Sequence, residues 1–252
     1  MNIRIFAAAL AGAALYAGLA SAQSPAPPAE PKLAPAGARP MHVHVDALKP
    51  GHLIASEYTF CKPAAQGHVA PAADKSPRIS WSKGPAGTKS YAVIIYDTDS
   101  PAEHREWMNQ EGHMLTAATQ RKLFFHMVVV DIPANVTALP RGEESDARVV
   151  HGKSAPAKIG VHGANGFTQA FAANDAMKGT YLGYDGPCSP WNDENAHHYH
   201  FTVFALSVPS LGLTGAFDAP AAVAAMQGKV LAQGQLIGLY STNPALVAKL
   251  PK

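Results

Sequence analysis

The 252-residue sequence has little charge of either sign and almost no excess of one sign over the other. Lysine and arginine number 20 against 18 acidic residues, and removing Arg4 with a predicted leader leaves 19 against 18, a formal charge of +1. Proteins that bind nucleic acid or strongly anionic membranes usually carry a basic patch or a large positive excess. The near-balance therefore gives no support to a nucleic-acid partner.

Long apolar runs are missing beyond the first 22 residues. These residues open with a short basic stretch containing Arg4, continue as an apolar run over residues 6–20, and end in small residues. This pattern is typical of a secretory signal peptide cleaved before Gln23. The run is too short, and too rich in Ala and Gly, for a membrane span, although a retained anchor is the alternative. We expect a periplasmic or secreted protein that does not span the membrane.

Motifs of known catalytic chemistry are also missing. The sequence contains no nucleophile elbow and no spaced zinc ligands such as HExxH, so we assign no catalytic residue, metal site or cofactor. His42 and His44 share one face of a predicted strand, a spacing that can hold a metal. No third ligand is evident nearby, so a half-exposed edge strand is the simpler interpretation.

The chain after the leader divides into two parts. Residues 23–40 consist largely of Pro and Ala with little that can form a core, which predicts a disordered or extended tether. Residues 41–252 are long enough for one substantial core and show no internal repeat and no second linker, which predicts a single domain.

Within that domain the readable elements are mostly strands. Patterns typical of strands occur at residues 41–45, 58–61, 90–96, 123–132 and 199–206. Helical signals are confined to residues 105–122, where they are weak, and to residues 219–232. Many strands with Gly and Pro between them predict a mainly β fold, an antiparallel β-sandwich of two sheets with a few peripheral helices. A parallel α/β fold is less favoured, because helices do not alternate with the strands.

Three polar side chains follow or interrupt the most apolar strands. Asp97 and Asp99 come directly after the strand at residues 90–96, and in extended backbone both point to the same side. They are able to bind a cation, orient a histidine or act as an acid/base pair, or simply cap a turn. His126 lies in the middle of an apolar run and must find a polar partner, either a backbone carbonyl or one of these aspartates.

The densest group of unusual residues lies at 183–206. Gly186 and Pro187 predict a tight turn whose backbone N–H groups face an anion. His197 and Tyr199, two apart, share a face of the following strand, and His198 points the other way. With the aspartates and His126 they predict a small polar pocket for an anionic head group, especially one that carries an ammonium.

The two cysteines, Cys61 and Cys188, are an even pair in a chain predicted to be exported. An oxidising compartment favours a disulfide between them, and two separate buried thiols are the alternative.

Six motifs in order give the sequence a resemblance to the phosphatidylethanolamine-binding protein family, in its bacterial branch of Raf-kinase-inhibitor-like proteins. They are SPRISW at 76–81, GTKSY at 87–91, DTDSP at 97–101, FHMVV at 125–129, GYDGPCSP at 183–190 and HHYHF at 197–201. The resemblance implies a β-sandwich with a shallow pocket for phosphate, phosphoethanolamine and similar groups. The pocket residues it implies are Asp97, His126, Pro187, His197 and Tyr199, with Asp99 and Gly186 beside them.

The sequence departs from the family pattern at three places. Thr98 replaces a proline between the aspartates, and His198 replaces an arginine after the pocket histidine, which makes the local charge depend on pH. Extra residues at about 102–123 separate the aspartates from His126. These differences alter the rim of the pocket, so its shape and ligand preference do not follow from the resemblance.

Three hypotheses for the function follow. The first is an exported protein that binds small anionic ligands or phospholipid head groups, with a regulatory role as an option. The second is a protein-interaction module of the protease-inhibitor type, with a protease as the partner. The third is a hydrolase that uses the histidine and aspartate cluster. Because the family has no generally established catalytic cycle, the resemblance favours a binding protein over an enzyme.

Overall fold

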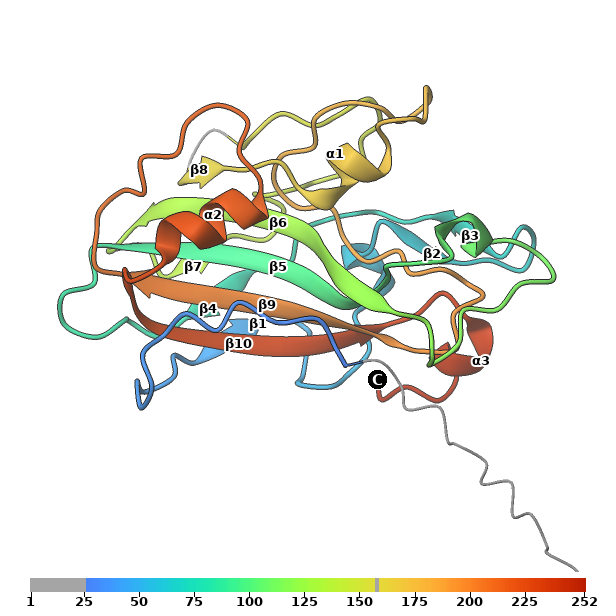
Figure 1. Ribbon diagram of the computed structural model, residues 1–252, viewed down its shortest axis with the longest axis horizontal. Helices are drawn as coiled ribbons and strands as arrows, with labels where there is room; N and C mark the ends of the chain where they lie inside the picture. Colours follow the sequence, from blue (N-terminus) through green and yellow to red (C-terminus); the bar gives the residue numbers. More distant parts are fainter. Residues whose placement is uncertain (1–25, 157–158) are drawn as a thin grey trace, which may run out of the picture.

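A large twisted antiparallel sheet forms the body of the molecule (Figure 1). The structure, a computed structural model, describes residues 26–156 and 159–252. The strands in chain order are β1 (Val43–Val45), β2 (Cys61–Pro63), β3 (Val69–Pro71), β4 (Ile79–Trp81), β5 (Ser90–Pro101), β6 (Arg121–Pro133), β7 (Ala138–Leu139), β8 (Val161–His162), β9 (His197–Leu206) and β10 (Val230–Tyr240).

The described residues form three sheets, two of which pack face to face. The large sheet has the order β10-β9-β5-β6-β8, and a smaller sheet has the order β1-β4-β7. The third sheet is the hairpin β2-β3. All strand pairs within these sheets are antiparallel. The prediction of a mainly β, two-sheet antiparallel fold is confirmed.

Both faces of the central strand β5 are buried, which explains its unbroken apolar sequence. Tyr91, Val93 and Ile95 point into the core between the two sheets. Ala92 and Ile94 point to the opposite face, where they pack in a second core with helix α2 (Ala219–Met226). This alternation follows from the period of two in a strand. Because the middle of the sheet is buried on both faces, a site on this sheet can form only at the polar ends of β5, β6 and β9.

The helices in the described part of the chain are few and short. Besides α2 they are α1 (Gly166–Ala170), α3 (Pro244–Val247) and the 3₁₀ turns η1 (Ser56–Tyr58) and η2 (Arg105–Trp107). The predicted helix at 219–232 begins correctly, where Asp218 caps the first turn of α2 by accepting from the N–H of Ala221. It ends six residues early, because β10 starts at Val230. The weak helix predicted at 105–122 is wrong apart from η2.

Strand β10 was not predicted from the sequence, because glycines and glutamines interrupt its apolar pattern. Gly234 and Gly238 lie where the backbone approaches other parts of the chain closely. A Cβ at Gly234 would lie 2.0 Å from the carbonyl oxygen of Met41, and one at Gly238 would lie 2.8 Å from the side chain of Ile54. Glycine is therefore required for packing at two positions of this strand.

The N-terminal part of the described chain lies against β10. The backbone N–H groups of Leu33 and Ala34 donate to Oε1 of Gln233, at 2.7 and 2.9 Å. Residues 26–40, part of the predicted tether, contain no helix or strand. Leu33 and Ala34 nevertheless pack against the second core. The predicted signal peptide, residues 1–22, lies outside the described residues. Within the described ranges, no helix has both the length and the hydropathy needed to cross a bilayer.

Candidate functional site

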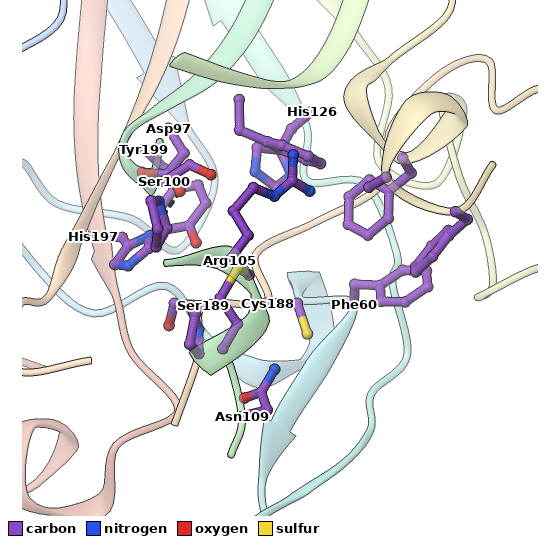
Figure 2. Close-up of a pocket in the computed structure, with 17 residues that line it drawn as sticks. Phe60, Asp97, Ser100, Arg105, Asn109, His126, Cys188, Ser189, His197 and Tyr199 are labelled. Atoms are coloured by element: carbon purple, nitrogen blue, oxygen red, sulfur yellow. Dashed lines mark hydrogen bonds and ion pairs between the residues drawn. The ribbon is translucent and has the colours of Figure 1, made fainter. Parts of the chain in front are cut away.

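A pocket opens at one end of the large sheet, where β5 ends and β6 and β9 begin (Figure 2). Asp97 is the Cα partner of both Phe124 in β6 and Tyr199 in β9, so the antiparallel register brings these strand ends together. Asp97, His126, His197 and Tyr199 all line the cavity. Its volume of about 190 Å³ is below the roughly 300–1,000 Å³ of drug-sized sites, which suits a small ligand.

The ring of His197 lies between two buried carboxylates. Its Nδ1 is 2.7 Å from Oδ2 of Asp97, and its Nε2 is 3.2 Å from Oδ2 of Asp193. Burial disfavours the charged ring, but the charges and hydrogen bonds of Asp97 and Asp193 outweigh it and raise the pKa of His197 to about 10. Because both nitrogens are engaged, His197 supplies positive charge to the pocket and has no ring nitrogen left for a ligand.

Arg121 completes this charge network from β6. Its guanidinium reaches both carboxylate oxygens of Asp193, at 2.5 and 3.1 Å, and donates to the carbonyls of Asp99 and Thr116. Asp193 is fully buried and Arg121 nearly so. The two carboxylates, Asp97 and Asp193, are thus balanced by one imidazolium and one guanidinium. The network leaves no uncompensated negative charge at the base of the pocket.

The ring of His126 is neutral, in contrast to the charged ring of His197. Its Nδ1 lies 2.7 Å from the carbonyl oxygen of Asp185, and a carbonyl only accepts, so Nδ1 carries the proton. Burial lowers the pKa of His126, although the charge of Asp97 and the hydrogen bond to Asp185 oppose the shift. The ring is therefore neutral and its Nε2 is an acceptor. That Nε2 is buried and has no hydrogen-bond partner among the described residues.

The expectation that an aspartate side chain fixes the tautomer of His126 is wrong. Asp97 is instead bonded to His197 and, through Oδ1, to the backbone N–H of Asp99. The backbone carbonyl of Asp185 takes this role, which was the other option from the sequence. It is available because Asp185 is anchored by Nζ of Lys153 at 2.9 Å and by Nδ2 of Asn165 at 2.6 Å.

Gly186 and Pro187 are not among the residues that line the pocket. The N–H of Gly186 donates to Oδ1 of Asp74 at 2.7 Å, and the carbonyl of Pro187 accepts from the N–H groups of Phe60 and Cys61. This N–H, which the sequence suggested as an anion donor, is therefore already bonded to a buried carboxyl oxygen of the same chain. A Cβ at position 186 would lie 2.2 Å from the carbonyl oxygen of Tyr58, which explains the glycine.

Asp99 also lies outside the pocket lining and pairs with His198. Its Oδ2 accepts from the backbone N–H of His198 at 2.9 Å and lies 3.0 Å from Nδ1 of that ring. Burial acts to raise the pKa of Asp99, but these hydrogen bonds outweigh it and lower the pKa to about 2. Asp97 and Asp99 thus serve different histidines, and only Asp97 belongs to the pocket.

Tyr199 and the disulfide shape two walls of the cavity. Burial and the nearby charge of Asp97 raise the pKa of the Tyr199 hydroxyl well above its usual value, so it stays a neutral phenol. Cys61 and Cys188 form a disulfide with an S–S distance of 2.03 Å. Cys188 lines the pocket beside Ser189 and Pro190, so the bond ties this wall to the start of β2.

The extra residues at about 102–123 supply the rim. Arg105, Met108 and Asn109 line the pocket from this segment. The segment is fixed by buried Asn192, whose Nδ2 lies within hydrogen-bond distance of three carbonyls and whose Oδ1 accepts from the N–H of Asn109. The three carbonyls are those of Trp107, Gln110 and His113. The extra segment is therefore an ordered part of the site.

Sequence reasoning missed several residues of the site. Asp193 gave a usable signal, since it precedes His197 by four positions in the same polar loop. Arg105 and Arg121 gave none, because they lie in a segment whose path was not predictable. Four phenylalanines also line the cavity, and nothing in their local sequence indicates it: Phe60, Phe124, Phe167 and Phe171.

Known proteins resemble this chain over most of its length. A family model described as phosphatidylethanolamine-binding protein matches residues 44–241. A UPF0098 protein of Aquifex aeolicus is 33% identical over 213 residues, which cover 84% of this chain and 95% of that protein. The UPF0098 protein YbcL of Escherichia coli is 31% identical over 176 residues, covering 70% of this chain and 74% of its own length.

Two solved structures share the fold. One, from Chlamydia trachomatis, is described as a putative phosphatidylethanolamine-binding protein homologue. It has a TM-score of 0.52 and 25% identity, and the match covers 80% of this chain and 97% of that one. The crystal structure of Escherichia coli YbcL, described as a new member of the mammalian family, has a TM-score of 0.57 and 23% identity. That match covers 81% of this chain and 99% of the other.

Proposed function

The chain belongs to the phosphatidylethanolamine-binding protein family, and from that premise we propose that its pocket binds small anionic ligands such as phosphate or a phosphoethanolamine-like head group. One observation carries the proposal. The Nε2 of His126 is a buried acceptor that has no partner among the described residues, and its ring lines the cavity. A buried polar atom of this kind costs free energy unless something occupies the site, which favours a bound ligand.

The charges around the cavity support an anion. Asp97 is neutralised by His197, and Asp193 by His197 and Arg121. Arg105 on the rim then adds a permanent positive charge. An anion that keeps one proton, such as hydrogen phosphate or the monoanion of phosphoethanolamine's phosphate group, satisfies both groups, because its oxygens accept from Arg105 and its hydroxyl donates to His126. An ammonium group on the ligand is an alternative donor.

The test is a titration of the protein with inorganic phosphate and with phosphoethanolamine while the histidine ring nitrogens are followed by NMR. We expect the His126 signals to move and to saturate at millimolar ligand. The signals of the exposed His44 serve as an internal control and stay in place. The variant His126→Gln should weaken binding, and the control His44→Gln should not. A His126 signal that stays fixed at millimolar ligand contradicts the proposal.

We also propose that the protein acts outside the cytoplasm, as the predicted leader at residues 1–22 suggests. The disulfide supports this, because such bonds persist mainly in oxidising compartments. Cell fractionation of the full-length chain, with N-terminal sequencing of the product, tests the proposal. A product that retains Met1 in the cytoplasmic fraction contradicts it.

A further inference from the structure

A second depression lies beside the small sheet, away from the pocket described above. Two four-residue segments line this small-sheet depression, residues 39–42 before β1 and residues 82–85 after β4. Its volume is about 300 Å³, compared with about 190 Å³ for the pocket. The N–H of Gly84 donates to the hydroxyl of Tyr91 near the start of β5, whereas the pocket lies at the end of that strand. The two cavities are therefore at opposite ends of β5.

Hydrogen bonds hold the two walls of the small-sheet depression together. The N–H of His42 donates to Oγ of Ser82 at 3.0 Å, and the N–H of Ser82 donates to the carbonyl of His42 at 2.9 Å. Met41 is tied to β10, because its N–H donates to the carbonyl of Gln233 at 3.1 Å. The Ser82 oxygen accepts from the protein, so its hydroxyl hydrogen can be donated to a ligand. Walls fixed in this way need little reordering when a ligand binds.

The charged side chains of the small-sheet depression are all basic. Arg39 and Lys83 are exposed permanent cations, one on each wall, and His42 adds an imidazole. The lining contains no acidic side chain. Within the residues described, no ion pair joins Arg39, His42 or Lys83 to a carboxylate. An anion entering the depression therefore meets positive charge that the protein itself does not compensate.

The two histidines that the sequence places on one strand face have different surroundings. Nε2 of His44 lies 3.4 Å from Oδ1 of Asp46, and Nη1 of Arg78 lies 3.9 Å from the same oxygen. Asp46 thus compensates both of these neighbours. His42 instead lines the small-sheet depression with the two permanent cations. The depression, and not the pair of histidines, is therefore the place where a ligand finds uncompensated charge.

We propose that the small-sheet depression binds a diphosphate group, either as the free anion or as an ester. A ligand that balances two permanent cations needs at least two negative charges in a compact group. Two linked phosphates supply them, and they contact Arg39 on one wall and Lys83 on the other. The hydroxyl of Ser82 is a further donor. This site shares no lining residue with the pocket, so the inference does not rest on the proposed function.

The first experiment is an NMR titration of isotope-labelled protein in metal-free buffer at neutral pH with inorganic phosphate and with pyrophosphate. The backbone amides of His42 and Lys83 report on the small-sheet depression, and the ring of His126 reports on the pocket. We expect pyrophosphate to saturate the His42 and Lys83 signals at an about tenfold lower concentration than phosphate, because it carries more charge. Equal affinities at these two amides, or amides that do not respond to pyrophosphate, overturn the inference. A fixed His126 signal contradicts only the proposed function.

A third probe, isopentenyl diphosphate, separates the two sources of a diphosphate group. One of its phosphates is esterified, and the other is free as in pyrophosphate. Tighter binding of the ester than of pyrophosphate at His42 and Lys83 identifies an esterified diphosphate as the ligand. Weaker binding of the ester identifies the free anion.

Charge variants locate the site. Arg39→Gln and Lys83→Gln should each weaken pyrophosphate binding about fivefold, because each removes one charge-assisted contact. Both side chains are exposed, so the circular dichroism spectrum should stay native. The matched controls are Arg78→Gln and Lys89→Gln, which remove exposed cations that do not line the small-sheet depression. If Lys89→Gln weakens binding as much as Lys83→Gln does, the attraction is diffuse and the depression is not a site.

Discussion

The Nδ1 of His197 lies 2.7 Å from Oδ2 of Asp97, and this contact joins the start of β9 to the end of β5 inside the pocket. Both side chains are almost fully buried. The contact has two effects, since it compensates a carboxylate that would repel an anion and it holds two neighbouring strand ends together. The pocket therefore depends on a histidine whose two ring nitrogens both contact carboxylates of the protein and not a ligand.

Replacing this histidine should destabilise the fold. In His197→Gln the imidazolium is lost, and Asp97 stays buried without its positive partner. Removing one member of a buried ion pair typically costs about 3–5 kcal/mol, which urea unfolding at pH 7 will measure. The control is His198→Gln, because His198 is half exposed and its pair with Asp99 should contribute no more than about 1 kcal/mol. Equal losses in the two variants would contradict a charged His197.

The contribution of His197 should also depend on pH. Its folded-state pKa of about 10 lies above the unfolded value of about 6.5, so the folded state holds the proton more tightly. The stabilisation is fully present below pH 6.5 and is lost as the pH rises through 10. The difference in unfolding free energy between the wild type and His197→Gln should therefore shrink between these limits. A difference that stays constant over this range would show that His197 does not titrate there.

Asp74 should also make stability fall as the pH rises, over a lower pH range than His197. Burial and the negative charge of Asp185 raise its pKa to about 8, although Lys153 and the N–H of Gly186 oppose the shift. The folded state then keeps a proton that the unfolded chain releases near pH 4, so stability falls as the pH rises from about 4 to 8. Asp74→Asn keeps the acceptor for Gly186 without the charge.

We expect Asp74→Asn to equal the wild type in stability at pH 4 and to exceed it by a few kcal/mol at pH 9. Urea unfolding at both pH values provides the measurement. The nearest cation, Nζ of Lys153, lies 3.9 Å from the unbonded Oδ2 of Asp74. If the variant is instead less stable at pH 9, the carboxylate is ionised and paired with Lys153.

The disulfide should stabilise the fold and one wall of the pocket. It links residues 127 apart, and closing a loop of that size contributes about 4–5 kcal/mol in the chain-entropy description. Dithiothreitol treatment, or the double variant Cys61→Ser/Cys188→Ser, should lower the urea midpoint accordingly and weaken phosphate binding. Two free thiols in the unfolded, unreduced protein would contradict the bond.

Asn192 should control the rim of the pocket without contacting the ligand. Asn192→Ala removes its side-chain contacts with the segment that carries Arg105, so the backbone amides of residues 107–113 should exchange hydrogen faster. We expect a stability loss of about 1–3 kcal/mol and a severalfold lower affinity for phosphate. The exposed Asn135 provides the control variant Asn135→Ala. Unchanged exchange in Asn192→Ala would mean that other contacts hold the segment.

Local sequence was sufficient to predict much of the sheet and part of the site. Strands β5, β6 and β9 were predictable because each carries an apolar run, and β10 was not, since close packing against Met41 and Ile54 requires glycine there. Asp97, His126, His197 and Tyr199 were identified as neighbours, and the structure brings them together in one pocket. Asp99, Gly186 and Pro187 were grouped with them and lie outside its lining.

The sequence by itself determined which residue types were available: paired histidines, two aspartates after an apolar strand, and two cysteines in a chain predicted to be exported. Only the tertiary structure decided their roles, because these depend on which polar atoms meet once the strands are in register. The carbonyl of Asp185 makes His126 a neutral acceptor, whereas Asp97 and Asp193 make His197 a cation. The same side chain thus acquires opposite properties at two positions, since burial makes each histidine depend on the nearest oxygen atoms.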